Sequence, residues 1–582
     1  MARFFRRVLH VPLIANVKAA IVKIIIHVNN KMAQMKQIGQ LLEELGFISG
    51  EQVKVALDVQ QANPRFFGET LQELDFVTSA EIAEAIAMQN NLEYIDLEHV
   101  VPSAEALKLI PQNIAITRNI LPISVNEEYL VVATQDVNDL LTLDYLRKIS
   151  KKKIKFVVGD KHSIARQSEI SYYQLKNPIE LEIKEIVKEA LSDIEIDTPH
   201  LIDLILNNAI KDRATDVHIT PGHSVIDIFY RIDGVLEHFY SLPLKLHPQI
   251  VSRIKIISNL DISEQRIPQD GSFSYGFLNE TIDLRVSSLL TSHGENIVMR
   301  LLRKNASLFS LKHLGLSEEN SAKIERYFAK SYGIILIVGP TGSGKTTTLY
   351  SALRKIDSLK KNVLTIEDPI EYQFSFIRQT QLNEKAGYGF NKAIRAFLRQ
   401  DPDVILIGEI RDAETAELAV RASITGHLVL STLHTNDAVG TITRLGDLKV
   451  PSYLIGSGLL AVIAQRLIRK LCQNCKVGVH KSVEQLLLEG VPQRILDLYP
   501  NYTLFEAAGC EQCRNSGYRG REAIVEILEI DAEIESMITA EANNMDILKV
   551  AREKGMNSIK EDGYIKALLG VTSMQEIHRV IN

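Results

Sequence analysis

The sequence predicts a multi-domain α/β protein built around a phosphate-binding core. Its 582 residues are too many for one hydrophobic core, because a single domain usually holds about 100 to 200 residues. Short apolar runs of strand length alternate with helical stretches along much of the chain. A glycine-rich loop at residues 339–346 stands directly between such a strand and such a helix. This strand, loop and helix arrangement is typical of nucleotide-binding folds.

The composition is that of an ordinary folded protein. Hydrophobic residues make up 46% of the chain and charged residues 24%. The net charge of -6 argues against a surface built to hold a polyanion, so nucleic acid is not expected as a partner. Four cysteines are too few for disulfide bonds to stabilise a chain of this length. A reducing compartment such as the cytoplasm is therefore expected.

Residues 1–31 form a basic segment without a single acidic residue. Polar and charged side chains interrupt its apolar run, so no membrane span is predicted there. The segment could lie on an anionic membrane as a basic amphipathic helix. A disordered tail, or a start codon assigned upstream of Met32 or Met35, are the alternatives.

An internal repeat opens the next region, residues 32–175. Gln37–Gln60 aligns with Phe66–Gln89, and each copy predicts a pair of helices with a capping residue between them. From about Tyr94 to Tyr173 the pattern changes to short strands alternating with helices, which predicts a small α/β unit. A charged, helix-prone linker, residues 176–199, follows.

Residues 200–310 predict a second α/β domain, ahead of a core that we place at residues 311–582. The predicted strands of this second domain lie at His218–Thr220, Val225–Ile232, Ile282–Leu289 and Ile297–Leu302. A Pro-Gly turn separates the first two strands.

The phosphate loop carries the first chemical signal. Gly339–Thr346 fits G-x-x-x-x-G-K-[ST], in which backbone N–H groups and a helix N-terminus surround the phosphates of ATP. Lys345 would reach the β- and γ-phosphate oxygens, and Thr346 would offer its hydroxyl to Mg²⁺. The predicted nucleotide-binding residues are Gly339, Pro340, Thr341, Gly342, Ser343, Gly344, Lys345, Thr346 and Thr347.

Two acidic stretches follow apolar strands further along the chain. Glu409 ends a strand that begins at Asp403, as expected for the Walker B acid that orders the metal and the attacking water. Glu367 and Glu371 form an acidic cluster directly after the strand Val363–Ile366. Taken alone, either stretch would be an ordinary strand end or a solvated turn. Beside the phosphate loop they become candidate acids of an ATPase site.

All four cysteines fall in two C-x-x-C pairs, Cys472/Cys475 and Cys510/Cys513. Two knuckles of this spacing can place four thiolates around one tetrahedral Zn²⁺, a closed structural site with no position left for water. The chain between the pairs predicts an inserted helical piece at Lys481–Leu498. Free thiols are the alternative.

Taken together, several motifs resemble those of the type II/IV secretion ATPase family. Three of them look like the Asp box, Walker B and His box of that family, and two others resemble motifs of the domain that precedes its motor core. The motifs are EDPIE at 367–371, LRQDPDVILIGEIRD at 398–412, TGHLVLSTLHTNDA at 425–438, RIDGVL at 231–236 and RIPQDGSF at 266–273. The resemblance covers roughly residues 201–582, and several motifs in one order are more specific than any single motif.

The resemblance implies a RecA-like P-loop ATPase core at 311–582 that ends in a helical part. It implies a PAS-like domain at 200–310 and, further upstream, a helical and α+β N-terminal domain. The cysteine pairs correspond to a tetracysteine zinc insert, residues 472–513. In the family this insert accompanies assembly and export ATPases and is absent from typical retraction ATPases, so the resemblance favours an assembly ATPase.

The resemblance also implies roles for individual residues. Glu409 would be the Walker B acid, Glu367 and Glu371 would polarise water, and His434 would sense the γ-phosphate. Arginines are needed because the transition state of phosphoryl transfer spreads negative charge over its oxygens. The implied catalytic residues are Glu409, Glu367, Glu371, His434 and the cross-subunit arginines Arg231 and Arg285, with His427, Arg395, Arg399 and Arg411 as further candidates.

The N-terminal repeat resembles the tandem motifs of a cyclic-di-GMP-binding domain that some of these ATPases carry. Those motifs open with Arg-Leu-Gly, whereas this sequence has Gln37-Ile-Gly and Phe66-Phe-Gly, so both guanine-facing arginines are missing. Arg65 stands one position early and is a candidate substitute. Cyclic-di-GMP binding and a helical docking domain for a membrane partner are the two alternatives.

The sequence and the resemblance together predict a ring-forming, hexameric ATPase on the cytoplasmic face of the inner membrane. It would bind ATP, Mg²⁺ and Zn²⁺ and power assembly of a type IV pilus, including the adhesive MSHA type, or a type II secretion pseudopilus. Its expected partners are a membrane platform protein and a cytoplasmic docking protein. A RecA-like helicase or DNA translocase is one alternative, which the lack of a base-stacking aromatic series disfavours. A nucleotide-binding signalling module is another, which the intact loop and acids disfavour.

Overall fold

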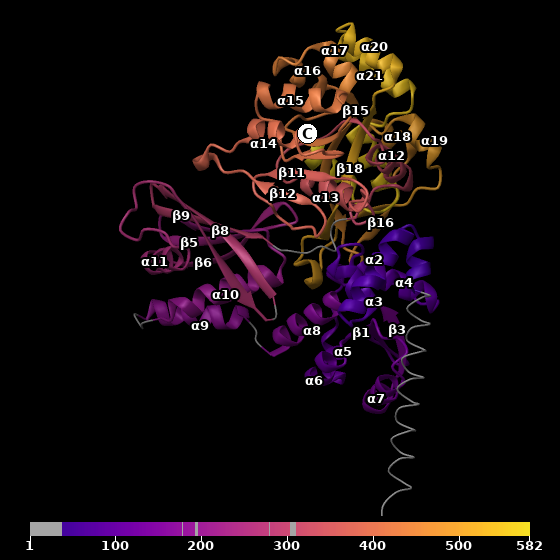
Figure 1. Ribbon diagram of the computed structural model, residues 1–582. Helices are drawn as coiled ribbons and strands as arrows, with labels where there is room; N and C mark the ends of the chain where they lie inside the picture. The colour runs from indigo at the N-terminus through magenta and orange to yellow at the C-terminus, as the bar shows by residue number, and fades with distance from the viewer. Residues whose placement is uncertain (1–37, 177–178, 193–195, 279, 303–309, 582) are drawn as a thin grey trace, which may run out of the picture. The chain divides into compact units, whose positions relative to one another are not determined.

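The computed structural model describes residues 38–176, 179–192, 196–278, 280–302 and 310–581 (Figure 1). The predictions for residues 1–31 lie outside these described residues. The chain divides into two compact units, with the division between Ala165 and Arg166. None of the described helices has the length and apolar character needed to cross a membrane.

The first unit begins with two helical hairpins, as the repeat predicts. A helix over residues 38–44 precedes α2 (Gly50–Ala62), and α3 (Phe67–Glu73) precedes α4 (Ser79–Gln89). Ser49 and Thr78 accept hydrogen bonds from the backbone N–H groups three residues later, and Gln52 and Glu81 complete the two capping boxes. The predicted caps are thereby confirmed.

A three-stranded sheet completes the first unit and confirms the small α/β part. Strand β2 pairs antiparallel with β1 and parallel with β3. The elements are α5 (Ala104–Leu109), α6 (Gln112–Thr117), β1 (Ile120–Val125), β2 (Tyr129–Thr134), α7 (Leu140–Ser150) and β3 (Lys153–Val158). Helix α8 (Lys161–Lys176) carries the chain from the first unit into the second.

The second unit opens with a six-stranded antiparallel sheet in the order β6-β5-β4-β9-β8-β7. Alternate side chains such as Val217, Ile228 and Tyr230 are buried in one core with α10 and α11, while the other face is polar. The elements are α9 (Ile179–Leu191), α10 (Thr198–Lys211), β4 (Asp216–Pro221), β5 (Val225–Ile232), β6 (Val235–Pro243), α11 (His247–Ile257), β7 (Gln269–Phe277), β8 (Glu280–Thr291) and β9 (Gly294–Leu302). The four predicted strands of this region are confirmed as β4, β5, β8 and β9.

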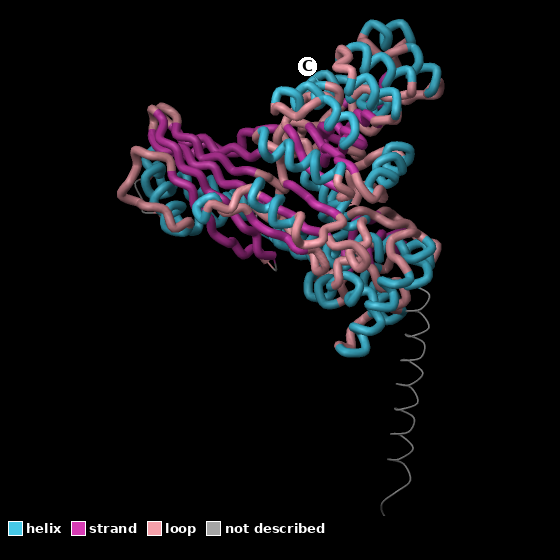
Figure 2. Tube along the Cα trace, turned by 45° about the horizontal axis from the view of Figure 1, so that its top comes forward, coloured by secondary structure: helices cyan, strands magenta, loops and turns pink. Residues whose placement is uncertain are grey.

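The remainder of the second unit is built on a seven-stranded sheet in the order β12-β11-β13-β14-β10-β15-β18, in which only β18 runs antiparallel to its neighbour. Figure 2 shows strands in magenta and helices in cyan. The elements of the sheet and its parallel crossovers are α12 (Glu318–Phe328), β10 (Gly333–Val338), α13 (Lys345–Lys355), β11 (Val363–Glu367), β12 (Arg378–Gln381), α14 (Phe390–Phe397), β13 (Val404–Ile407), α15 (Ala413–Ile424), β14 (Leu428–Leu433), α16 (Gly440–Asp447), α17 (Ser452–Gly458), β15 (Leu459–Leu471) and β18 (Tyr518–Glu529).

Both faces of this sheet are covered, which explains why its central strand β10 is apolar along its whole length. In β10, Ile334, Leu336 and Val338 belong to one core cluster, and Ile335 and Ile337 belong to the other. A strand buried on both faces has no solvated face to carry polar side chains, so the alternation of an amphipathic strand is absent. The sequence run GIILIV therefore forms a central strand.

The tetracysteine region and the C-terminal helices complete the second unit. The predicted helical piece between the cysteine pairs is confirmed by α18 and α19. The elements are β16 (Val477–Val479), α18 (Val483–Leu488), α19 (Gln493–Leu498), β17 (Leu504–Glu506), α20 (Ala532–Thr539), α21 (Asn544–Glu553), α22 (Ile559–Leu568) and α23 (Met574–Ile581).

The carboxyl ends of four central strands meet at one edge of the seven-stranded sheet. Val338 of β10 is in register with Leu433 of β14, and Ile407 of β13 lies between Ile366 of β11 and Ser431 of β14. The loops that follow these strands therefore lie side by side. Ligands of open parallel sheets bind at this edge.

Candidate nucleotide-binding site

The phosphate loop leaves β10 at Val338 and ends at the first turn of α13. Gly339 and Gly344 have φ angles of 147° and 87°, which side chains rarely allow. A Cβ atom at Gly339 would lie 2.4 Å from the carbonyl oxygen of Gln465, and one at Gly344 would lie 2.8 Å from Gln465 Nε2. Glycine at these two positions lets the loop pack directly against β15.

Gln465 supports the loop from the neighbouring strand β15, and it is not among the residues that the sequence analysis singles out. Its side chain is fully buried. Its Nε2 donates to the carbonyl of Ser343 at 2.8 Å, and its Oε1 accepts from the hydroxyl of Thr348 at 2.7 Å. One amide thus ties β15 to both the loop and α13. Because an Asn or Gln inside an apolar strand needs partners for its amide, its position in the run LLAVIAQRL was the one available signal.

Lys345 starts α13 and folds over the loop. Its ammonium group donates to the carbonyls of Gly339 at 2.8 Å and Pro340 at 3.1 Å. Burial lowers the pKa of Lys345, and the negative charge of Glu409 opposes this shift. The charges of the loop lysine and of the predicted Walker B acid therefore act on each other.

Glu409 stands two residues after β13 and is half-buried. Its Oε1 accepts from Arg411 Nε at 2.5 Å, and its Oε2 lies 3.2 Å from Nε2 of His434, which directly follows β14. Arg411 also reaches Asp368 Oδ2 at 3.3 Å, just past the end of β11. The ends of three adjacent strands thus contribute one cluster of charged side chains, which brings together three candidate site residues, Glu409, His434 and Arg411.

Glu367 takes a different position from the other predicted acids, because its side chain is only 4% exposed. Its Oε2 accepts from the hydroxyl of Tyr350 at 2.5 Å. Its Oε1 accepts from Thr365 Oγ1 at 2.5 Å and from Gln379 Nε2 at 3.0 Å. Both oxygens of this carboxylate are therefore engaged inside the protein.

Glu371 lies at the other end of the same acidic segment and is exposed. Its backbone N–H donates to the hydroxyl of Tyr350 at 3.1 Å. Desolvation by the surrounding protein groups raises the pKa of the Glu371 carboxyl, and the positive charges of Arg285 and Arg300 oppose the rise.

Arg231 and Arg285 lie in one row across the polar face of the six-stranded sheet. Asp216 of β4 is in register with Arg231 of β5 on one side and with Arg300 of β9 on the other, and Arg300 is in register with Arg285 of β8. Asp216 is only 5% exposed; its Oδ1 accepts from Arg300 Nε at 3.0 Å, and its Oδ2 lies 3.7 Å from Arg231 Nε. Sequence reasoning missed Arg300 and Asp216. These residues join the row only through the register in which the strands pair, and the local sequence does not record that register.

Three further candidates lie away from this cluster. His427 precedes β14, at the opposite end of that strand from His434, and its Nδ1 lies 2.9 Å from the carbonyl oxygen of Ala422. Arg395 Nη2 pairs with Glu414 at 3.1 Å, and Arg399 donates to the carbonyl of Arg395. The structure does not bring these three side chains to Glu409.

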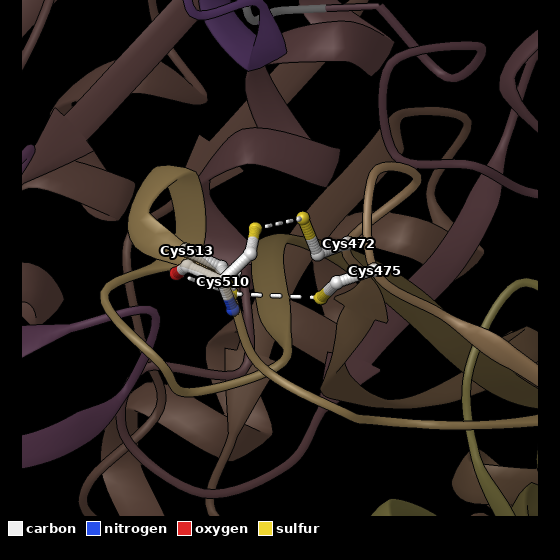
Figure 3. A group of neighbouring side chains, drawn as sticks. All are labelled: Cys472, Cys475, Cys510 and Cys513. Carbon is white, nitrogen blue, oxygen red and sulfur yellow. Dashed lines mark hydrogen bonds between the residues drawn. The ribbon is translucent and has the colours of Figure 1, made fainter.

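The four cysteines come together as their spacing predicts (Figure 3). Their sulfur atoms all lie within 4.8 Å of one another, with Cys472–Cys510 at 3.8 Å and both Cys475–Cys513 and Cys510–Cys513 at 3.7 Å. A tetrahedral zinc with Zn–S bonds of about 2.3 Å separates its sulfurs by about 3.8 Å, whereas a disulfide needs about 2.05 Å. The donor set and its spacing fit one Zn²⁺.

A glycine-rich loop between a strand and a helix, with an acid and a histidine at the ends of adjacent parallel strands, defines a P-loop ATPase. Comparison with known proteins specifies the family. A family model described as "Type II/IV secretion system protein" matches residues 192–579, and the chain belongs to that family. The resemblance drawn from the motifs is thereby confirmed, and family membership does not favour the helicase or signalling alternatives. A model of the MshEN domain matches residues 90–173.

Two relatives agree with the family assignment. The type IV pilus assembly ATPase PilB of Myxococcus xanthus is 37% identical over 561 residues, which cover 93% of this chain and 98% of the relative. The type II secretion system ATPase E of Vibrio cholerae is 45% identical over 395 residues, which cover 67% of this chain and 77% of the relative. The crystal structure of the pilus retraction motor PilT with bound ADP is similar with a TM-score of 0.43 at 26% identity, covering 64% of this chain and 95% of that chain.

Proposed function

We propose that this chain forms a hexameric ring on the cytoplasmic face of the inner membrane. The ring hydrolyses ATP to ADP and phosphate and thereby powers assembly of a type IV pilus or a type II secretion pseudopilus. The observation that carries the proposal is the convergence of Lys345, Glu409 and His434 at one sheet edge in a chain of this family. Relatives named as pilus assembly and type II secretion ATPases support assembly or secretion as the process that ATP hydrolysis powers.

Within the site, we assign the phosphates of ATP to the backbone N–H groups of Gly339–Thr347 and to Lys345, and Mg²⁺ to Thr346. Bound Mg-ATP supplies the phosphoryl group that is transferred to water. Glu409 is the Walker B acid, and His434, 3.2 Å from it, senses the γ-phosphate. Of the two acids proposed to polarise water, Glu371 is the better placed, since both oxygens of Glu367 accept hydrogen bonds inside the protein.

The arginine row is assigned to a neighbouring subunit's nucleotide. Arg231, Arg285 and Arg300 present three guanidinium groups on one face, and the single carboxylate of Asp216 leaves that row with a positive excess. Such a row suits the negative charge that spreads over the phosphoryl oxygens in the transition state.

We assign four regions to the chain: an N-terminal domain at 32–175, a linker at 176–199, a PAS-like domain at 200–310 and a RecA-like core at 311–582. The antiparallel sheet with helices on one face supports the second domain, and the parallel sheet covered on both faces supports the core. The tetracysteine insert, residues 472–513, holds one structural Zn²⁺ and is the feature that favours assembly over retraction.

The N-terminal unit is proposed to dock the ring onto a cytoplasmic partner beneath the membrane platform protein. The MshEN match begins at residue 90 and so does not extend over the helical repeat. Arg65, the candidate substitute for a guanine-facing arginine, pairs with Glu73 at 2.6 Å. Docking is therefore favoured over cyclic-di-GMP binding, and equal ATP turnover with and without cyclic-di-GMP is the expected result.

The experiment that tests the ATPase proposal is the substitution Lys345→Ala in the full chain. Turnover of ATP should fall by about 100-fold or more, because the positive charge at the transferred phosphoryl group is lost. The matched control is Lys355→Ala at the end of the same helix, where the ammonium pairs with Glu325 at 3.0 Å and turnover should persist. Undiminished turnover in the Lys345 variant, with a native circular dichroism spectrum in both, would contradict the proposal.

A further inference from the structure

One hydroxyl group in the core connects the nucleotide-binding helix with both ends of the acidic segment. Tyr350 belongs to α13, the helix that begins with Lys345 and Thr346, and its side chain is 1% exposed. Its hydroxyl donates to Glu367 Oε2 at 2.5 Å and accepts from the backbone N–H of Glu371 at 3.1 Å. The position of Glu371 relative to α13 is therefore set through Tyr350.

The acceptor of this hydroxyl is itself held from other directions. Glu367 Oε1 accepts from Thr365 of its own strand and from Gln379 Nε2 of β12. Gln379 in turn accepts from the backbone N–H of Phe374 at 2.7 Å and donates to the carbonyl of Tyr372 at 2.9 Å. A buried network whose donors and acceptors are matched is rigid, because every displacement leaves a polar group unpaired. Glu367 is thus a fixed anchor for the Tyr350 hydroxyl.

The ring of Tyr350 has its own packing, separate from its hydrogen bonds. It contacts the ring of Phe374 edge to face, with centroids 5.4 Å apart and an interplanar angle of 83°. Edge-to-face contact is a property of the ring and not of the hydroxyl. Removal of the oxygen atom alone therefore keeps the packing and deletes the two hydrogen bonds.

We propose that Tyr350 is a positioning residue for ATP hydrolysis, whose hydroxyl holds the backbone at Glu371 in a fixed relation to Lys345 and Thr346. The inference rests on the proposed ATPase function, in which Glu371 polarises the attacking water. Tyr350 acts through Glu371 and does not itself reach the nucleotide. A catalytic group displaced by about 1 Å can lose about 100-fold in rate, so loss of this tie affects the chemical step.

The first test is Tyr350→Phe in the full chain, with turnover and ATP affinity measured separately. We expect kcat to fall by about 10-fold or more while ATP affinity stays within about 2-fold, because the phosphate-binding groups are unchanged. The matched control is Tyr327→Phe. Tyr327 is also buried, and its hydroxyl donates to a carboxylate oxygen, Glu529 Oε2, at 2.8 Å. Because Tyr327 belongs to α12 and not to the nucleotide-binding helix, its variant should retain wild-type kcat. Wild-type kcat in the Tyr350 variant overturns the proposal.

A second test separates positioning from a general structural role. If Tyr350 acts through Glu371, then Tyr350→Phe should cause no further loss of kcat in a Glu371→Ala background. Fully additive losses in the double variant would overturn the inference. Hydrogen exchange of wild-type peptides that cover residues 368–372 gives a readout without any substitution: the Glu371 amide should exchange slowly, and exchange at the rate of an open loop also overturns it.

The outcomes distinguish this proposal from the ATPase proposal on which it rests. A wild-type chain without ATP turnover, or a Lys345→Ala variant that retains it, counts against the ATPase function itself. A chain whose turnover depends on Lys345 but not on Tyr350 leaves the ATPase function standing and removes only the positioning role.

Discussion

At the scale of single residues, Asp562 combines burial with a strongly shifted pKa. It lies on α22, is 5% exposed, and accepts the backbone N–H of Val525 at 2.9 Å through Oδ2. Burial raises the pKa of its carboxyl to about 6, although the charge of Lys566 and the Val525 N–H favour the ionised form. Because the unfolded value is about 3.9, the native chain binds more protons than the unfolded chain between about pH 4 and pH 6.

The extra protons bound by the native chain set how its stability depends on pH. Where the native state binds more protons, stability falls as pH rises, so this contribution is fully present below about pH 4 and is lost as pH rises through about 6. Asp562→Asn keeps an oxygen for Val525 and should remove a destabilisation of about 3 kcal/mol at pH 7. Denaturant unfolding of both chains from pH 4.5 to 7.5 measures the difference. The exposed Asp546→Asn on α21 should keep the wild-type slope, and parallel curves for the Asp562 variant would contradict the prediction.

The residues that sequence reasoning found and missed differ in a physical way. Lys345, Glu409 and the four cysteines belong to local patterns, in which the spacing of residue types already states the chemistry. Gln465, Asp216 and Arg300 act through partners on other strands, and no local spacing records which strands become neighbours. For Glu367, the sequence predicts the position after a strand but not the surroundings of the side chain. Both of its carboxylate oxygens accept hydrogen bonds, and two of the donors, Tyr350 and Gln379, lie on other elements of the fold.

At the scale of elements, the tetracysteine insert offers a direct chemical prediction. Its four sulfurs match the spacing of one tetrahedral zinc, and the Cys513 sulfur already accepts from the N–H groups of Cys510 at 3.1 Å and Gly517 at 3.2 Å. Hydrogen bonds of this kind stabilise the thiolate that a metal requires. Metal analysis of the purified chain under reducing conditions should find about one zinc per chain.

Substitution provides the control for the zinc prediction. Cys510→Ser should lose the metal and lower the melting temperature, because the binding free energy of a structural zinc is part of the folding free energy. Ser516→Ala, in the loop that follows Cys513, changes no ligand and should keep the zinc. Fewer than about half of the wild-type chains loaded with zinc would count against a structural site.

Elements were more predictable than their arrangement. The hairpins with caps at Ser49 and Thr78, the run GIILIV of β10 and the helical piece between the cysteine pairs were all recognised, because caps, apolar runs and periodicity are local properties. The order of the seven-stranded sheet was not predicted. It brings β14 between β13 and β10 through long crossovers, and such pairing depends on contacts far apart in sequence.

At the scale of the whole molecule, the proposed ring makes each nucleotide site from two subunits. One subunit supplies the phosphate loop with Lys345, and its neighbour supplies the arginine row with Arg285. Lys345→Ala and Arg285→Ala should each be nearly inactive alone, because every site in either homogeneous ring lacks one of the two groups.

Mixing the two inactive chains tests this arrangement. In a randomly mixed ring with head-to-tail contacts, about a quarter of the interfaces join an intact loop from the Arg285→Ala chain to an intact arginine row from the Lys345→Ala chain. Turnover should therefore return to a measurable fraction of the wild-type rate after the chains are dissociated and reassembled together. A mixture of the Lys345→Ala chain with a Lys345→Ala, Arg285→Ala double variant is the matched control and should stay inactive, since it contains no intact loop. If the first mixture also stays inactive although both chains enter the same rings, Arg285 acts on the nucleotide of its own subunit.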